Sequence, residues 1–137
     1  MLIIGWKGTA IPDNRRLIPQ RGANARIIAG KLLKTKKRRL TANPEYKAFK
    51  EGLAWEIRAQ TREKYRTINL MISFELATRP KNQEIDKQNL LKPICDAVEL
   101  SGLIKDDKQI GVIMLMPVVE SKDRADHLYL FINGEKR

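Results

Sequence analysis

The stretch Thr67-Ile-Asn-Leu-Met-Ile-Ser-Phe-Glu-Leu-Ala77 alternates polar and apolar residues along its whole length. In a strand, successive side chains point to opposite faces of the sheet, so a period of two predicts a strand with one buried face. That face carries five apolar side chains: Ile68, Leu70, Ile72, Phe74 and Leu76. We therefore expect residues 67–77 to form a half-buried strand.

A helix is expected on each side of this strand in the sequence. Upstream, Asn43-Pro44-Glu45 combines a capping Asn, a Pro at the first helical position and an acid in the first turn. Apolar residues then follow helical spacing to about Thr61, with the aromatic residues expected in the core. Downstream, residues 90–100 predict a second helix with Asn89 as its N-cap. Pro93 fits only near the start of that helix, because deeper in it would clash with the preceding turn.

Further strands are expected over residues 2–6, 109–119 and 127–133, with residues 134–137 as a loose tail. Two helices among these strands predict an α+β fold, with both helices packed on a mixed β-sheet. The 137 residues are too few for two ordinary cores. We expect one domain over residues 1–137.

The charge is concentrated in the first half of the chain. The whole chain carries 27 Lys and Arg, 16 Asp and Glu and a formal charge of +11. Residues 1–66 hold 17 of the basic residues and only 5 of the acids, and residues 21–40 hold eight basic residues and no acid. Such an excess favours a polyanion, because neutralising phosphates releases their counterions. A solvated loop or a nuclear-targeting tract would show the same composition.

We expect a basic, mobile loop at about residues 20–40, and nucleic acid rather than a membrane surface as its partner. The residues expected to bind it are Arg15, Arg16, Arg21, Arg26, Lys31, Lys34, Lys36, Lys37, Arg38 and Arg39.

Several classes of site and location are disfavoured by composition. No apolar run approaches the roughly 20 residues of a membrane helix, and the apolar start ends at Lys7, too early for a signal peptide. A cytoplasmic location is expected. One Cys and one His cannot build a zinc cage, and His127 is poorly placed for a nucleophile system. Catalysis would use carboxylates, lysine and a metal ion, with no small-molecule cofactor.

Six acids gather in this basic protein: Glu84, Asp86, Asp96, Glu99, Asp106 and Asp107. Converging carboxylates leave Mg²⁺ with open positions for water and phosphate oxygens. The alternative is structural, because Asp86 also suits a helix start and Asp106-Asp107 an ordinary turn. Four polar residues of the second predicted helix fall on one stripe: Gln88, Lys92, Asp96 and Glu99. A Lys92–Asp96 pair there would be a surface ion pair or would hold a lysine beside the metal loop.

The segment Asp86-Lys-Gln-Asn-Leu-Leu-Lys-Pro-Ile-Cys-Asp-Ala-Val98, followed by Gly102-Leu-Ile-Lys-Asp-Asp-Lys-Gln-Ile110, resembles the RusA family of Holliday junction resolvases. The family pattern is an Asp-x-Asp-Asn-Leu-x-Lys helix start, an Asp-Ala-Leu body and an Asp-Asp-x-Gln turn. Asp96 precedes Asp107 by the family's eleven residues. The region Trp6–Gly22 resembles the family's N-terminal motif loosely.

The resemblance implies a homodimeric, Mg²⁺-dependent endonuclease acting on four-way or branched DNA, with Mn²⁺ as a substitute ion and a bacterial or phage host. Asp86, Lys92 and Asp107 match the family's catalytic positions, with Asp86 and Asp107 as metal ligands. Further positions that could touch the metal are Glu84, Gln88 and Asp106. Supporting positions are Asn89 and Asp96.

One residue departs from the family pattern, because Gln88 stands where the family has its second Asp. A neutral amide oxygen would bind a metal more weakly than a carboxylate. Glu84 would then replace it, or the site would work with fewer carboxylates at higher Mg²⁺, or the chain would bind branched DNA with little cleavage. A basic RNA-binding protein is the remaining alternative.

Overall fold

The strand predicted over residues 67–77 is an inner strand of a four-stranded sheet. The structure is a computed structural model, and it describes residues 1–19, 27–28, 31–32 and 40–137. The strand order is β1-β8-β6-β7. The strands are β1 (Leu2–Gly8), β6 (Tyr65–Leu76), β7 (Ile110–Glu120) and β8 (Asp126–Lys136). β8 runs antiparallel to β1 and β6, whereas β7 runs parallel to β6, so the sheet is mixed.

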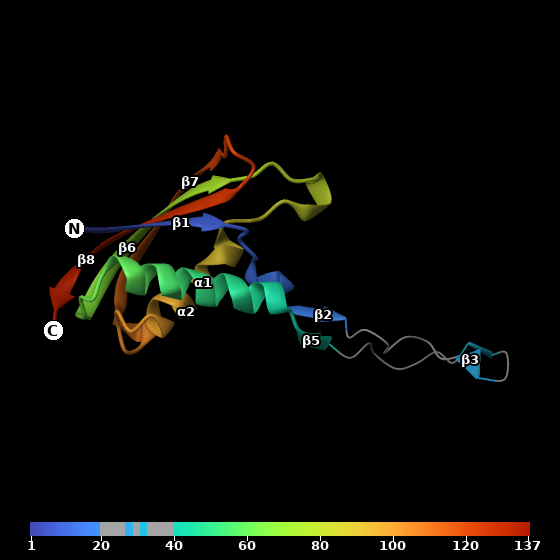
Figure 1. Cartoon of the computed structure of the whole chain (residues 1–137), viewed down its shortest axis with the longest axis horizontal. Coiled ribbons are helices and arrows are strands. Elements are labelled where there is room, and N and C mark those ends of the chain that lie inside the picture. Colours follow the sequence, from blue (N-terminus) through green and yellow to red (C-terminus); the bar gives the residue numbers. More distant parts are fainter. Residues whose placement is uncertain (20–26, 29–30, 33–39) are drawn as a thin grey trace.

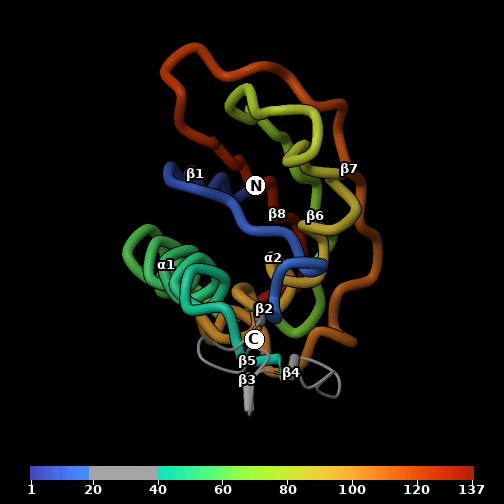
Figure 2. The backbone as a smooth tube through the Cα atoms, turned by 90° about the vertical axis from the view of Figure 1, so that its right-hand side faces the viewer, coloured from blue at the N-terminus to red at the C-terminus, as the bar shows by residue number. Residues whose placement is uncertain are grey.

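Two helices, α1 (Pro44–Gln60) and α2 (Gln88–Leu100), pack against the same face of this sheet (Figures 1 and 2). The core lies between them. From β6 it takes the alternating side chains predicted from the sequence, which are at most 6% exposed. The predicted α+β fold is thereby confirmed. None of the helices in the described ranges is both long and apolar enough to cross a membrane.

Shorter elements connect these parts. β2 (Leu17–Pro19) pairs with β5 (Leu40–Ala42), and β3 (Ile27–Ile28) pairs with β4 (Lys31–Leu32). The single-turn helices are η1 (Asp13–Arg15), η2 (Lys81–Gln83) and η3 (Asp107–Gln109). Most of the basic loop predicted at about residues 20–40 lies outside the described residues.

Helix α1 begins and ends close to the predicted positions. Asn43 caps it, because its side-chain oxygen accepts a hydrogen bond from the Glu45 N–H at 3.0 Å. Tyr46 and Phe49 are buried as expected. Trp55 is not: 67% of this residue is exposed, because it lies on the side of α1 that faces away from the sheet.

Two predicted boundaries are wrong. Helix α2 begins at Gln88, so Asn89 is its second residue and not its N-cap. The Asp86 carboxylate instead accepts the Gln88 N–H at 3.0 Å, a local bond that short acidic side chains favour at such turns. β8 continues through the expected loose tail to Lys136, because residues 134–136 pair with the start of β6.

Candidate functional site

Helix α2 connects two parallel strands, and this crossover positions the site. Lys87, at the beginning of α2, donates through Nζ to the carbonyl of Met116, late in β7, at 3.2 Å. The helix therefore runs antiparallel to β7, and its second half lies beside the start of that strand. Asp107 occupies the turn η3 just before that start.

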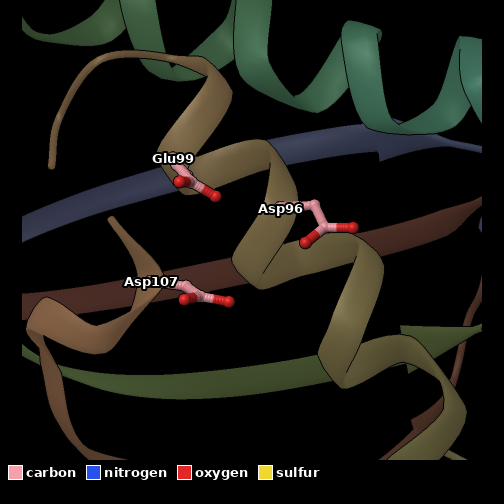
Figure 3. Close-up of side chains that lie close together, drawn as sticks. All are labelled: Asp96, Glu99 and Asp107. Atoms are coloured by element: carbon pink, nitrogen blue, oxygen red, sulfur yellow. The ribbon is translucent and has the colours of Figure 1, made fainter. Parts of the chain in front are cut away.

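Three carboxylates meet where α2 passes this turn. Oxygen atoms of Asp96, Glu99 and Asp107 all lie within 4.8 Å of one another. Figure 3 shows Asp96 and Glu99 projecting from α2 toward the space that Asp107 faces from its turn. Asp107 is exposed and the other two are half-buried, so the cluster opens to solvent on one side.

The cluster borders an open cavity of about 330 Å³ between α2 and β7. Its polar lining comes from the predicted stripe of α2 together with the turn before β7. The lining residues are Gln88, Leu91, Lys92, Cys95, Asp96, Asp107, Ile110 and Ile113. The stripe, the catalytic-type lysine and the last family Asp thus share one cavity.

Two lysines compensate the negative charge. Lys92 Nζ lies 3.7 Å from one Asp96 oxygen, and Lys50 Nζ from α1 lies 3.4 Å from the other. Lys92 is 63% exposed and can swing toward a ligand, whereas Lys50 is held between the helices at 28% exposure. Asp96 is therefore fixed from two sides while it faces the other carboxylates.

The thiol of Cys95 lies in the same cavity. Its burial, and secondarily the charges of Asp96 and Asp107, raise its pKa to about 11. A thiol must lose its proton to bind a metal. At neutral pH the donor set of the cavity therefore consists of oxygen atoms.

The turn that carries Asp107 is fixed by its neighbours. Asp106 caps η3 by accepting the Lys108 N–H at 2.9 Å, and this bond holds the pKa of Asp106 below its usual range. The Gln109 amide oxygen accepts the Asp106 N–H in return, at 2.9 Å. The Asp106 carboxylate thus orders the backbone beside Asp107.

The end of α2 is anchored as well. Arg58 of α1 donates to the carbonyls of Leu100 and Ser101, at 2.6 and 3.1 Å. Gly102 then adopts a φ of 84°, a conformation that glycine takes at little cost, and turns the chain toward the buried Leu103. These contacts fix the path from Glu99 to Asp107.

Other predicted site residues lie outside the three-acid cluster. Asp86 is exposed at the start of α2, and Asn89 follows in the first turn. Glu84 lines a different cavity, beside Val118 and Glu120 at the far end of β7. Asp86 and Glu84 as metal ligands remain predictions.

Of the predicted DNA-binding residues, Arg15 and Arg16 lie in and next to η1, where Arg16 pairs with Asp13 at 3.1 Å. Lys31 lies in β4, and its side chain is outside the described part. The others fall within residues 20–26 and 33–39, also outside it.

Glu99 is the residue that the sequence argument did not assign to the metal. The available signal was its place on the polar stripe with Asp96, which helical spacing predicts. The missing information was which end of α2 would meet Asp107.

Residues 29–126 match the family model of endodeoxyribonuclease RusA. The match spans most of the chain, including all of α2, η3 and β7. The chain belongs to the RusA family. Membership implies a nuclease that acts on branched DNA, and the three-acid cluster lies in the matched part. No curated protein matches the sequence.

Proposed function

We propose that this RusA-family chain is a Mg²⁺-dependent, structure-specific endonuclease that resolves Holliday junctions in DNA recombination and repair, with residues 1–137 acting as one domain. The observation that carries the proposal is the convergence of Asp96, Glu99 and Asp107 within 4.8 Å, in an otherwise basic protein. A protein that binds phosphates gains nothing from clustered carboxylates unless a cation accompanies them.

The donor set fits a hard divalent cation. Three carboxylates can each offer one oxygen, and the exposed side at Asp107 leaves room for water and a phosphate. Asp96, Glu99 and Asp107 would hold Mg²⁺, with Mn²⁺ as a substitute. When bound, the ion would polarise the scissile phosphate and favour ionisation of the attacking water.

Lys92 would act on the phosphate. Its ammonium group is 3.7 Å from Asp96 and largely exposed, so a small rotation brings it from the carboxylate to a phosphate oxygen in the same cavity. A positive charge there stabilises the negative charge that develops on the phosphoryl group. Lys50 would stay with Asp96 and keep that carboxylate oriented.

Asp86 retains its proposed role from the family motif. Its carboxylate is bonded to the backbone of Gln88, and Gln88 lines the cavity. Asp86 would thus contribute at the opposite end of the cavity from Glu99, where a DNA strand lying along α2 would pass.

DNA would be held by the basic first half of the chain, including Arg15, Arg16 and residues 21–39. Two copies of the chain would act on one junction, because symmetric resolution needs two cuts and a two-fold enzyme matches a two-fold substrate.

A catalytically weakened junction binder is the second candidate, and the position of Gln88 favours it. The side chain lines the cavity where the family has a carboxylate. Gln88→Asp should lower the Mg²⁺ concentration needed for cleavage if the site is weakened there. An unchanged requirement would instead indicate that Asp96, Glu99 and Asp107 suffice.

The test is a junction-cleavage assay across Mg²⁺ concentrations with a parallel binding assay. Asp107→Asn should reduce cleavage by at least about 100-fold, the upper range for loss of a group that merely supports a metal ligand. Junction affinity should be kept or improved, because a phosphate-repelling charge is gone. Asp123→Asn, an exposed acid outside the cavity, is the matched control and should cut normally. Normal cleavage by Asp107→Asn, or an uncut but bound junction at every Mg²⁺ concentration for the wild type, would refute the proposal.

A further inference from the structure

We infer that two copies of this chain associate through β7, whose open edges pair antiparallel about a two-fold axis at Met114. The inference rests on the proposed function in one respect, because it names the surface by which the proposed homodimer forms.

β7 is an edge strand with an apolar and exposed surface. One side pairs with β6, and within the ranges that the structure describes no strand pairs with the other side. No charged residue occurs from Ile110 to Val119. Val112, Met114 and Val119 are 58%, 54% and 58% exposed. Native edges are usually blunted by charges, and exposed apolar patches mark interaction surfaces.

A second copy of the same edge is the partner that this surface fits. Two identical strands paired antiparallel satisfy each other's main-chain groups through one self-complementary contact. β7 has register shifts at residues 111–112 and 116–117, and the regular part between them, residues 113–115, is centred on Met114. Beyond that centre, Lys87 already bonds the Met116 carbonyl and Pro117 has no N–H to donate. Pairing is therefore confined to the centre of the strand.

Charges at the two ends of the strand agree with this register. Lys108 precedes Met114 by as many residues as Glu120 follows it, and both are exposed. Antiparallel pairing about Met114 therefore brings Lys108 of each copy toward Glu120 of the other. Opposite charges at both ends favour this register over a shifted one.

The pairing would also place both candidate sites on one surface. The two-fold axis of an antiparallel pair is perpendicular to the sheet, so α1 and α2 of both copies would cover the same face. Ile113 lines the acidic cavity and adjoins Met114. Since a strand rises roughly 3.3 Å per residue, each cavity begins within about 10 Å of the axis. Two cuts in one junction require such neighbouring sites.

The uncovered face of the sheet offers a competing arrangement. Ile3, Phe131, Met71 and Met114 are successive partners across all four strands and form an apolar row there. Face-to-face packing would bury the whole row, including Ile3, which is 51% exposed. Edge pairing would bury Met114 and leave Ile3 free, so the two residues distinguish the arrangements.

The test is sedimentation equilibrium without DNA or Mg²⁺, on the wild type, Met114→Lys, Met114→Glu and the control Ile3→Lys. We expect dimers for the wild type and Ile3→Lys at micromolar concentration. Each Met114 variant should raise the dimer dissociation constant at least about 100-fold, because like charges then meet at the axis. Mixing the Lys and Glu variants should restore a heterodimer, which also shows that both are folded.

A monomeric wild type, dimeric Met114→Lys, no heterodimer on mixing, or dissociation caused by Ile3→Lys would overturn the inference. The measurement involves no cleavage, so its outcome is independent of the nuclease proposal. A dimer that depends on Met114 but cuts no junction would leave the interface standing and remove the enzymatic role.

Discussion

The two edges of the sheet are finished in opposite ways. At β1, the Gln60 side chain of α1 forms both hydrogen bonds that Gly5 directs away from β8: its oxygen accepts the Gly5 N–H at 3.2 Å, and its Nε2 donates to the Gly5 carbonyl at 2.7 Å. At β7, the one side-chain bond from outside the sheet to a main-chain carbonyl that the described residues show is from Lys87 to Met116.

This difference follows from where the helices lie. Figure 2 shows α1 beneath β1, while β7 forms the outer margin of the sheet on the other side of α2. α1 can therefore reach one edge with a side chain. The other edge stays accessible next to the acidic cavity, where DNA and a second copy would both approach. An edge closed by its own chain is structural, whereas an open edge beside a site is available for binding.

The first way to break the closed edge is to remove its anchor. Asp126, 1% exposed, accepts N–H bonds from Ala10 beyond β1 at 2.7 Å and from Ala77 beyond β6 at 2.8 Å, and pairs with Arg79. Asp126→Asn leaves Arg79 without its partner, and we expect a loss of about 3–5 kcal/mol in unfolding free energy by urea denaturation. The control Glu135→Gln, from an exposed pair with Arg66 on the same strand, should cost under about 1 kcal/mol. Equal losses in the two variants would contradict this account.

The second change opens the edge itself. Gln60→Ala removes both bonds to Gly5, and because the groups are exposed and regain water, we expect a loss of only about 1 kcal/mol. Hydrogen exchange at the Gly5 amide should become faster. Gln83→Ala, in an exposed turn, is the control and should change neither quantity. Unchanged exchange at Gly5 would mean that Gln60 does not close the edge.

The smallest effect concerns pH. The His127 ring, 2.8 Å away, and then the Ser121 hydroxyl and the Ala125 N–H hold the pKa of Asp123 well below its usual range. Asp123 also pairs with Lys7 of β1 at 3.2 Å. A carboxyl whose folded pKa is depressed adds stability above its unfolded pKa of about 3.9, and this is lost as the pH falls through the folded value.

The stability difference between wild type and Asp123→Asn should therefore be present at about pH 6 and shrink below about pH 4. Urea denaturation across this range measures it. A difference that stays constant with pH would show that the charge of Asp123 does not support the β1 side of the sheet.

Periodic segments of the fold could be predicted because one face of each is buried. The alternation in residues 67–77 and the Asn43 cap gave β6 and α1 within two residues of their observed limits. The edge position of β7 could not be predicted: its apolar run is typical of a buried strand, and only the sheet order exposes it. Trp55 escaped prediction for a similar reason, because helical spacing alone does not show where the sheet ends.

The candidate site was predictable in its parts and not in its pairing. Helical spacing placed Gln88, Lys92, Asp96 and Glu99 on one stripe, and the structure directs most of it into one cavity. The sequence argument joined Asp107 to Asp86, since both lie at loop ends. In the structure α2 runs antiparallel to β7, so Asp107 meets the second half of α2, at Asp96 and Glu99. That geometry is set by the crossover between parallel strands, which a local pattern does not encode.

The Gln60 bonds to Gly5 have a consequence for how far self-assembly can proceed. A sheet with two open edges can add copies at both ends, and repeated addition produces a fibre. Here one edge is already occupied by an amide of the same chain. Joining two copies through β7 would use up the remaining edge of each, so growth would end at two. One glutamine would thereby limit the stoichiometry of the assembly and protect it from polymerisation.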